Sequence, residues 1–450
     1  MNRTECLKNI RISQCMIVKN EEKNIERALS WGKKLMWEQI VVDTGSTDRT
    51  VELAKAMGAK IFYFEWIEDF AAAKNYAISK AQGDWIAFLD ADEYIEHDDI
   101  EKLKKLFPQL ISRRFDGLSV GLQQLNDEGQ IFSSGSQVRF FRNIPDIRYF
   151  RRIHEQLKSV SGKELRIADA VSEVSIFHLG YQSQSKTGKD KSGRNRKMIL
   201  RELEEHPMDY EMLGYLGDDY FSAGEKQEAE DCYFRAVEHM PSQIKSYDQR
   251  SAVTFTNLLI ILGEKDGVSW DKMEKIYRQA VRLLPQEADF DYVAGRFFAL
   301  QNQAEKAIVY LESAIEKLNT YGSYNKAYIL TTDLLNAYEL LGKCCYEAGE
   351  KQKCLSYAVI YLKYQPYGMA VLSRLIKVFF YSAEQQEKPE NLAEYREVMD
   401  FLSKLYSFSS LKDRLFIFKT AEISGCNYFA GYIKRTFFSS EERKQLGLVN

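Results

Sequence analysis

The sequence has little proline, no long apolar run and no excess of charge of one sign. Only 7 of its 450 residues are proline. Nowhere do eighteen apolar residues follow one another, so the sequence predicts no membrane-spanning helix. The 62 Lys and Arg residues nearly balance the 65 Asp and Glu residues, which leaves a formal charge of −3 and no overall basic field for nucleic acid or anionic membranes. The first residues contain no apolar stretch of the signal-peptide type, and we expect a cytoplasmic protein without nucleic-acid partners.

The cysteines are few and irregularly spaced. They number seven, form no C-x-x-C pair, and lie at Cys6, Cys15, Cys232, Cys344, Cys345, Cys354 and Cys426. An odd, unpatterned set argues against both a disulfide framework and a zinc site, so we expect reduced, mostly buried thiols. With 45% hydrophobic and 13% aromatic residues, the chain can bury sizeable cores, and its length suggests two to four folded units.

Residues 10 to 95 alternate short apolar runs with amphipathic stretches, which is typical of βαβ units in a largely parallel sheet. The pattern predicts strands at 12–18, 39–43, 59–64 and 85–89, and helices at 21–34, 47–57 and 71–81. Strand-like segments at 117–125, 137–142 and 171–178 complete this α/β domain with mixed or antiparallel pairing. Ligands of such sheets bind beyond the carboxyl ends of the strands, so that edge is where a site is expected.

From about residue 197 onward, the strand pattern gives way to helical repeats. The first unit has the spacing of the 34-residue tetratricopeptide repeat, in which small residues let two helices cross closely. Its characteristic residues are Leu213, Leu216, Gly217, Tyr220, Ala229, Tyr233, Ala236 and Pro241. The spacing recurs to give about four repeats. We therefore expect an α/β domain at 1–181, a basic linker or lid at 182–200, repeats at 201–368 and a helical region at 369–450.

The sharpest chemical motif ends the fourth predicted strand, where W-I-A-F-L is followed by Asp90, Ala91 and Asp92. Two carboxylates in D-x-D spacing can hold a divalent cation and a ribose hydroxyl, because hard cations prefer oxygen ligands. As a tripeptide alone, the pattern is weak and is more typical of an acidic turn after a strand.

Other polar clusters fall at the same edge of the predicted sheet. Asp43 and Ser46 follow the second strand in V-D-T-G-S-T-D, although simple helix capping also explains that loop. Asn20 and Glu21 follow the first strand, which ends at Val18, and a fourth cluster containing Lys74 lies in the helix before the D-x-D strand.

The four motifs in this order, M-I-V-K-N-E-E, V-D-T-G-S-T-D-x-T, A-x-x-K-N-x-A and W-I-A-F-L-D-A-D-E, resemble a family 2 glycosyltransferase of the GT-A fold. The resemblance covers residues 10 to about 180. It implies inverting transfer of a sugar from a UDP-sugar with Mg²⁺ or Mn²⁺. By position, Val18, Asn20 and Asp43 would line the nucleobase pocket with Lys74 nearby, Asp90 would meet the ribose, and Asp92 would bind the metal.

Two further segments stand out in a chain with five histidines: I-H-E-Q-L, with His154 and Glu155, and I-F-H-L-G-Y, with His178. An inverting displacement needs a carboxylate to take the proton of the acceptor, and Glu155 is the candidate base. His154 or His178 would complete the metal shell. A strand-capping role for each histidine and a surface ion pair for Glu155 stay open.

The helical repeats offer a long groove, which suits an extended chain or a protein surface. A GT-A domain followed by such repeats resembles the sublancin-type glycosyltransferases of bacteriocin precursors. That resemblance implies a Cys or Ser/Thr acceptor in a peptide, and a homodimer formed through the helical domain. A transferase of cell-surface glycans and a non-catalytic repeat scaffold are the alternatives. The basic residues Lys186, Lys189, Lys191, Arg194, Arg196 and Lys197 form either a lid over the diphosphate or a solvated linker.

Overall fold

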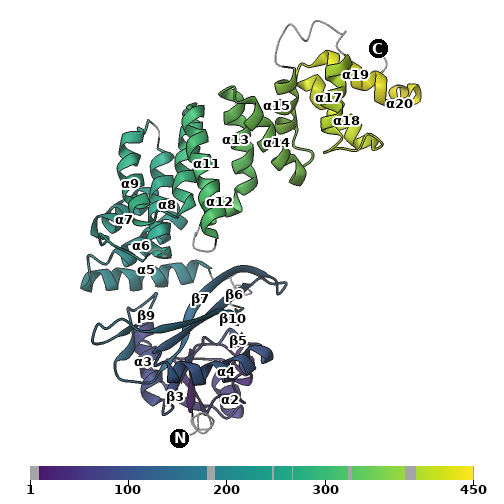
Figure 1. Ribbon diagram of the computed structural model, residues 1–450. Helices are drawn as coiled ribbons and strands as arrows, with labels where there is room; N and C mark the ends of the chain where they lie inside the picture. Colours follow the sequence, from purple (N-terminus) through teal and green to yellow (C-terminus); the bar gives the residue numbers. More distant parts are fainter. Residues whose placement is uncertain are drawn as a thin grey trace. The chain divides into compact units, whose positions relative to one another are not determined.

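The computed structural model describes residues 10–179, 188–245, 248–265, 267–322, 327–380 and 392–448. The chain forms two compact units, Met1–Pro207 and Met208–Asn450. The first unit combines strands with helices, and the second consists of helices and their connections (Figure 1). The predicted fold class, an α/β domain followed by helical repeats, is confirmed. The finer domain boundaries at 181, 200 and 368 stay predictions.

The first unit contains an eight-stranded mixed sheet with the order β3-β2-β1-β4-β7-β6-β10-β5. Its strands are β1 (Ile12–Val18), β2 (Glu38–Asp43), β3 (Lys60–Tyr63), β4 (Trp85–Phe88), β5 (Glu93–Ile95), β6 (Gly117–Leu125), β7 (Ile131–Arg142) and β10 (Ile167–His178). The pairs β1–β2, β2–β3, β1–β4 and β6–β10 are parallel, and β7 joins β4 to β6 in antiparallel fashion. The strands β8 (Ile147–Phe150) and β9 (Gln156–Ser159) form a separate antiparallel pair.

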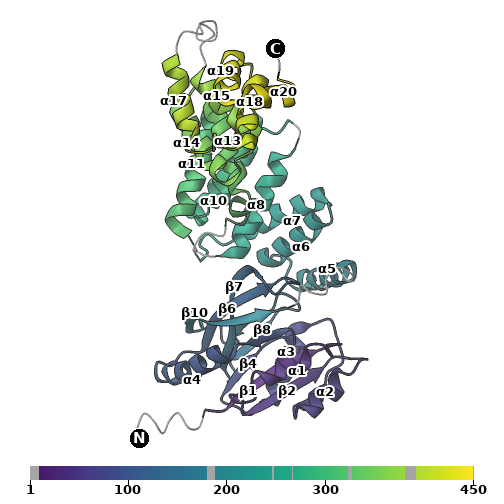
Figure 2. The same cartoon turned by 90° about the vertical axis from the view of Figure 1, so that its right-hand side faces the viewer.

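Helices cover both faces of the parallel strands. They are α1 (Ile25–Ser30), α2 (Thr50–Ala56), α3 (Phe70–Lys80) and α4 (His97–Ser112). In β4, Ile86 and Phe88 share one core with residues of α3, whereas Trp85 and Ala87 share another with residues of α4. Successive strand side chains point to opposite faces, so a strand covered on both sides has an unbroken apolar sequence. Figure 2 shows β4 lying between α4 and α3.

The predicted strands of this unit are present. Their ends shift by at most one residue in β1 to β4, whereas β7 and β10 are longer than predicted. Helices α1 and α2 are shorter than predicted. The sequence reasoning missed β5, β8, β9 and α4. Helix α4 had a readable signal, since its buried residues Ile100, Leu103, Phe107 and Leu110 recur at spacings of three and four.

The basic stretch predicted as a linker or lid is helical where the structure describes it. Residues 182–187, including Lys186, lie outside the described residues, as do the side chains of Lys189 and Lys191. From Gly188 the chain forms α5 (Gly188–Glu205), which buries Met198, Ile199 and Leu203. Lys197 of this helix pairs with Glu68 at 2.7 Å. Helix α5 therefore packs as part of the first unit.

The second unit contains the helix pairs that the repeat spacing predicts. They are α6 (Tyr210–Ser222) with α7 (Lys226–His239), α8 (Gln249–Gly263) with α9 (Trp270–Leu283), α10 (Ala288–Leu300) with α11 (Ala304–Tyr321), and α13 (Leu334–Glu347) with α14 (Lys351–Tyr364). The remaining helices are α12 (Tyr328–Thr332), α15 (Met369–Phe379), α17 (Leu392–Leu402), α18 (Leu411–Ile423), α19 (Asn427–Phe437) and α20 (Ser440–Gln445).

Small residues allow close helix crossings inside the repeats, as the spacing predicts. A Cβ atom added at Gly217 of α6 would lie 2.5 Å from the ring of Tyr233 in α7, and one at Gly295 of α10 would lie 2.6 Å from Leu311 in α11. Tyr233 is fully buried. The glycines therefore set how closely the two helices of a repeat approach.

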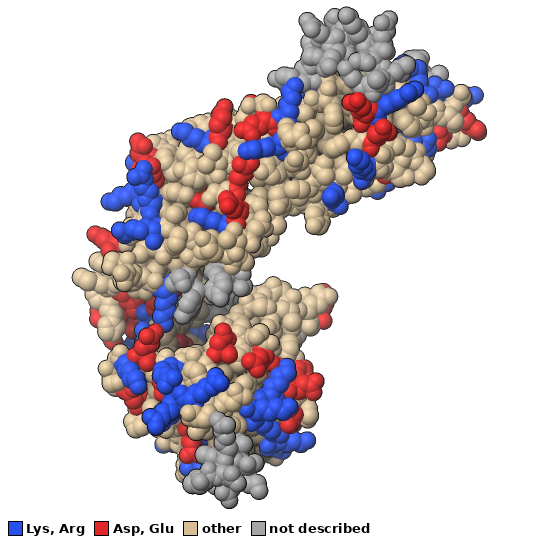
Figure 3. Space-filling view, viewed as in Figure 1, with Lys and Arg blue, Asp and Glu red and all other residues tan. Residues whose placement is uncertain are grey.

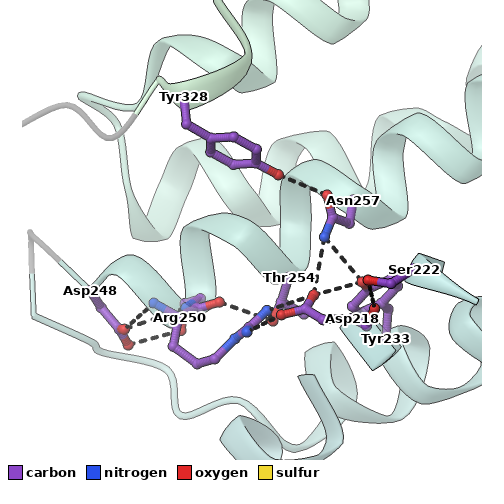
Figure 4. Close-up of polar contacts among 9 residues, drawn as sticks. Asp218, Ser222, Tyr233, Asp248, Arg250, Thr254, Asn257 and Tyr328 are labelled. Carbon is purple, nitrogen blue, oxygen red and sulfur yellow. Dashed lines mark hydrogen bonds and ion pairs between the residues drawn. The ribbon is translucent and has the colours of Figure 1, made fainter. Parts of the chain in front are cut away.

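A polar cluster joins the first two repeats to α12 (Figure 4). Arg250 of α8 forms an ion pair with Asp218 of α6, and Tyr233 donates a hydrogen bond to Asp218 Oδ1 at 2.7 Å. Asn257 of α8 donates to the same oxygen at 3.1 Å and accepts one from the Tyr328 hydroxyl at 2.8 Å. These contacts satisfy half-buried polar groups and hold four helices at fixed spacing.

Six of the seven cysteines lie among the described residues. Cys15, Cys232, Cys344, Cys345, Cys354 and Cys426 are free and buried, as predicted, and Cys6 lies outside the described residues. On the face shown in Figure 3, basic and acidic side chains are interspersed. Among the helices that the structure describes, none is long and apolar enough to cross a membrane.

Candidate active site

The candidate site lies at the carboxyl ends of β1, β2 and β4. The parallel register aligns Val18, the last residue of β1, with Asp43, the last residue of β2. Strand β4 runs parallel to β1 on its other side and leads directly into Asp90 and Asp92. The sheet therefore brings together the predicted motifs that follow these strands.

The loops after β1 and β2 are locked to each other by hydrogen bonds. The carboxylate of Asp43 accepts hydrogen bonds from the backbone amides of Gly45 and Ser46, each at 3.1 Å. The Ser46 hydroxyl accepts one from the Asn20 amide at 2.9 Å, and Asn20 Oδ1 accepts one from the Thr47 amide at 2.8 Å. Asn20 has a positive φ of 57°. The buried carboxylate of Asp43 thus holds this pair of loops in place, and its two oxygens can accept a further hydrogen bond.

Val18, Glu21 and Ala91 fix the path of the chain at this edge. The carbonyl of Val18 accepts the Thr44 amide at 2.9 Å, and the Glu21 amide donates to Thr50 Oγ1 at 2.7 Å. Ala91, between the two aspartates, is 6% exposed and packs in the core beneath α1. These contacts fix the path of the chain on either side of the D-x-D turn.

Asp90 lies between two buried cations. Its Oδ1 is 3.7 Å from the Lys74 ammonium, and its Oδ2 accepts a hydrogen bond from Arg139 Nη2 at 3.0 Å. Burial on its own would raise the pKa of Asp90, but Lys74 and Arg139 outweigh it and hold the pKa well below its usual range. Since 39% of the Asp90 side chain is exposed, this ionised carboxylate is accessible from the edge of the sheet.

Arg139 also pairs with Glu93, the residue that starts β5. Leu118 of β6 pairs with Phe140 and Ser119 pairs with Val138, so Arg139 is the extra residue of a β-bulge. Bulges commonly redirect a side chain beside a site. Glu93 is 1% exposed, and burial, supported by the charges of Asp90 and Asp92, raises its pKa to about 7 although Arg139 opposes the shift.

Asp92 faces His178, the last residue of β10. The distance from His178 Nε2 to Asp92 Oδ2 is 3.1 Å, and Nδ1 of the same ring lies 2.5 Å from Gln124 Oε1 of β6. Burial would lower the pKa of His178, but the hydrogen bond and charge of Asp92 prevail, and the pKa is raised. His154 is exposed in the segment just before Glu155, and the histidine whose contact with Asp92 is recorded is His178.

Glu155, the predicted base, forms an ion pair with Lys74 through Oε1. Lys74 is 4% exposed, and its ammonium also lies about 5 Å over the rings of Phe88 and Tyr149, at 5.2 and 5.1 Å. Burial would lower the pKa of Lys74, but the charges of Asp90 and Glu155 raise it above its usual value. Lys74 therefore connects Glu155 to Asp90, and the three side chains form one charged chain at the sheet edge.

Asp92 and His178 form the candidate donor set for a divalent cation. Among the described residues, no group of three or more His, Cys, Asp or Glu side chains is arranged to hold a metal. Asp92 and His178 nevertheless face each other at 3.1 Å, and the other ring nitrogen of His178 is oriented by Gln124. Mg²⁺ typically binds one or two carboxylates together with water and substrate phosphates. The pair therefore fits a cation whose coordination is completed by substrate.

Comparison with known proteins identifies this unit. Residues 13–156 match the family model described as Glycosyl transferase family 2. This segment is a glycosyltransferase family 2 domain. The resemblance predicted from the four motifs is thereby confirmed for the first unit. The aspartates, Lys74, Arg139 and Glu155 lie within the matched residues, whereas His178 lies beyond them.

Similar proteins cover only part of this chain. A TPR repeat-containing protein of Synechococcus elongatus is 36% identical over 225 residues, which span 49% of this chain and 54% of that protein. The prophage-derived glycosyltransferase SunS of Bacillus subtilis is 26% identical over 255 residues, which span 55% of this chain and 56% of that protein. The chain thus spans about half the length of these relatives. The crystal structure of S. aureus TarS 1-349 has 16% identity and a TM-score of 0.34, and covers 63% of this chain and 90% of that one.

Sequence reasoning missed four side chains that shape the site of this family 2 domain. They are Asn75, Glu93, Gln124 and Arg139. Asn75 had a signal, because it follows Lys74 in the K-N motif: its amide pairs with both backbone groups of Tyr149, at 2.8 and 3.0 Å, and so ties α3 to β8. No sequence signal pointed to Arg139 or Gln124, since each lies far along the chain from the aspartate or histidine that it contacts.

Proposed function

We propose that this chain is a metal-dependent, inverting glycosyltransferase that moves a hexose from a UDP-sugar to a Cys or Ser/Thr side chain of a peptide. The observation that carries the proposal is the contact of Asp92 with His178 beside Asp90, at the edge where the ends of β1, β2 and β4 meet. A family 2 domain occupies the same residues, and the curated relative SunS is called a glycosyltransferase.

Asp92 and His178 are the residues that would hold Mg²⁺ or Mn²⁺, which when bound would neutralise the charge of the departing diphosphate. Asp90 would accept a hydrogen bond from a ribose hydroxyl, because Lys74 and Arg139 keep it ionised and 39% of its side chain is exposed. The loops ordered by Asp43 and Asn20 would enclose the nucleobase.

Glu155 would act as the general base. Its Oε1 is engaged by Lys74, which fixes the carboxylate, and Oε2 would take the proton of the acceptor as the acceptor attacks the anomeric carbon. The bond to the diphosphate breaks as the new glycosidic bond forms on the opposite face of the sugar, so the anomeric configuration inverts. A thiol acceptor needs this base less than a hydroxyl, because part of it is already thiolate at neutral pH.

The second unit supports a peptide as the acceptor. Helical repeats present extended surfaces that bind chains or protein segments rather than small molecules. The curated relative in Synechococcus elongatus is likewise described as a repeat protein. In this proposal the helical unit binds the acceptor peptide, and the first unit performs the transfer; a homodimer through the helices is part of the same expectation.

The test is mass spectrometry of purified protein with Mg²⁺ or Mn²⁺, a panel of UDP-sugars, and Cys- and Ser-containing peptides. We expect UDP release and a hexose-sized mass gain on a peptide. Asp92→Asn and Glu155→Gln should each lower turnover by about 10²–10⁴-fold, Glu155→Gln less so with a thiol acceptor. Asp98→Asn is the matched control, since this acidic side chain is 97% exposed.

The outcomes separate the parts of the proposal. UDP release without any modified peptide would refute the peptide acceptor while retaining the transferase, and the search would move to glycan acceptors. Wild-type turnover of Asp92→Asn would refute the metal assignment. Absence of UDP release with every donor would favour a non-catalytic repeat scaffold.

A further inference from the structure

The turn that carries Glu155 has an unusual backbone. Arg151 and His154 both have positive φ angles, 77° and 52°, although neither is glycine. This left-handed region brings Cβ close to the following carbonyl, so L-residues adopt it only where their surroundings enforce it. The conformation just before Glu155 must therefore be held by neighbouring elements.

Glu202 of α5 supplies one such restraint. Its Oε2 accepts a hydrogen bond from the backbone amide of Arg152 at 2.9 Å. The side chain is 6% exposed, and the helix around it is anchored by the buried Met198 and Leu203. A hydrogen bond to a carboxylate is stronger than one to a neutral acceptor, particularly away from water.

Arg152 connects this helix to the start of α3 as well. Its carbonyl accepts the Phe70 amide at 2.8 Å, and its guanidinium pairs with Glu205 of α5 and lies 3.7 Å from Asp69. Asp69 is the N-cap of α3, where Oδ1 accepts the Ala72 amide at 2.8 Å. Arg152 thus joins three segments: the turn before Glu155, the first turn of α3, and helix α5.

Both members of the Lys74–Glu155 ion pair lie only a few residues along the chain from this junction. Lys74 lies on α3, five residues after Asp69, and Glu155 lies three residues after Arg152. A change in the turn would move Glu155 relative to Lys74, and a misplacement of about 1 Å in a reacting group can cost on the order of 10² in rate.

We propose that Glu202 is a positioning residue for Glu155: it holds the amide of Arg152 and thereby keeps the strained turn in the conformation that places the Glu155 carboxylate against Lys74. The inference rests on the proposed function, in which Glu155 is the base. Nothing in Glu202 touches the reacting atoms, and it acts only through the turn.

The chain offers a matched control. Glu204 lies two residues further along α5 and is exposed, so Glu204→Ala removes the same charge from the same helix without touching the turn. Glu202→Gln keeps an acceptor oxygen for the Arg152 amide, whereas Glu202→Ala does not.

The first measurement is hydrogen exchange in the full-length protein, followed by mass spectrometry of peptides that cover residues 151–155. We expect Glu202→Ala to speed exchange there at least about tenfold, with peptides of Ile12–Val18 unchanged as an internal check of folding. Glu202→Gln should stay near the wild type, and Glu204→Ala should match it. Unchanged exchange at 151–155 in Glu202→Ala would overturn the proposal.

The second measurement is UDP release with water as the acceptor, using whichever UDP-sugar the wild type hydrolyses fastest. We expect Glu202→Ala to lower kcat by about 10–100-fold with the KM for the donor within about twofold, and Glu202→Gln to restore most of kcat. In a Glu155→Gln background, the loss caused by Glu202→Ala should disappear, because no base remains to be positioned.

The outcomes distinguish this proposal from the function on which it rests. An equal loss from Glu202→Ala in both backgrounds would show a merely structural role and overturn the positioning role. If Glu202→Ala keeps a normal kcat while Glu155→Gln loses most of its kcat, the positioning role of Glu202 is overturned and the base assignment of Glu155 stands. Wild-type kcat in Glu155→Gln would overturn the base assignment and, with it, the proposal.

Discussion

Two glycines in equivalent Leu-Gly pairs of the repeats should respond to alanine with opposite signs. A Cβ at Gly217 would lie 2.5 and 2.6 Å from two ring carbons of Tyr233, whereas one at Gly342 would meet nothing closer than 3.8 Å. The Tyr233 ring cannot withdraw easily, since it is fully buried and its hydroxyl is held by Asp218. Because Gly217 has no room for a methyl group and Gly342 does, we expect Gly217→Ala to destabilise the folded state and Gly342→Ala to stabilise it.

The magnitudes follow from two opposing effects. Replacing a helical glycine by alanine gains about 1 kcal/mol of helix propensity at both positions. Overpacking a filled core costs about 1–3 kcal/mol, and the contact at Gly217 belongs at the upper end of that range. Gly217→Ala should therefore destabilise the folded state by about 2 kcal/mol, and Gly342→Ala should stabilise it by about 1 kcal/mol.

Scanning calorimetry of the full-length protein measures this directly. For a unit of this size, 1 kcal/mol corresponds to about 2–4 °C in Tm. The transition of the helical unit should fall by about 4–8 °C in Gly217→Ala and rise by about 2–4 °C in Gly342→Ala. A Gly217→Ala protein that melts at or above the wild-type temperature would refute the reasoning, as would a lower Tm for Gly342→Ala.

Three further predictions concern buried polar groups. Arg139→Leu should destabilise the first unit by about 3–5 kcal/mol in urea unfolding, because it leaves Glu93 buried without its cation; adding Glu93→Gln should recover much of the loss. Asn75→Ala should cost about 2 kcal/mol or more in the same assay, since it leaves both backbone groups of Tyr149 without their partners. Burial raises the pKa of Asp289 from 3.8 to about 6, so the folded state binds this proton more tightly than the unfolded state. That stabilisation is complete below pH 3.8 and is lost as the pH rises through 6; relative to Asp289→Asn, the wild type should lose about 3 kcal/mol between pH 3 and pH 7.

The sequence was most informative where structure depends on local pattern. β1 and β6 begin and end at the predicted residues, because an unbroken or alternating apolar run bounded by polar residues leaves little choice of register. The repeat helices were predicted from residue spacing, and the D-x-D motif from its position at the end of a buried strand. Helices α1 and α2 are shorter than their amphipathic stretches suggest, because the flanking residues form the loops that build the site.

Partners that lie far apart in the chain could not be predicted. Asp90 and Arg139 are 49 residues apart, and their contact depends on a β-bulge whose existence no local pattern in β7 signals. His154 and His178 were equal candidates as metal ligands, and the sequence could not choose between them. It is the register of β10 against β5, with His178 opposite Glu93, that brings His178 to Asp92.

The distribution of charge in the site supports the different ligands proposed for its two aspartates. Lys74 and Arg139 both contact Asp90, so the negative charge of this carboxylate is largely compensated while its exposed surface remains able to accept a hydrogen bond. Asp92 contacts neither cation among its described contacts, and its partner is the imidazole of His178. A carboxylate that contacts no Lys or Arg and lies beside an oriented imidazole suits a divalent cation, whereas a carboxylate held by two cations favours a neutral hydroxyl. In the proposed function, the same two cations would thus separate the roles of residues only two positions apart, because both of them, one from α3 and the other from the bulge in β7, contact Asp90.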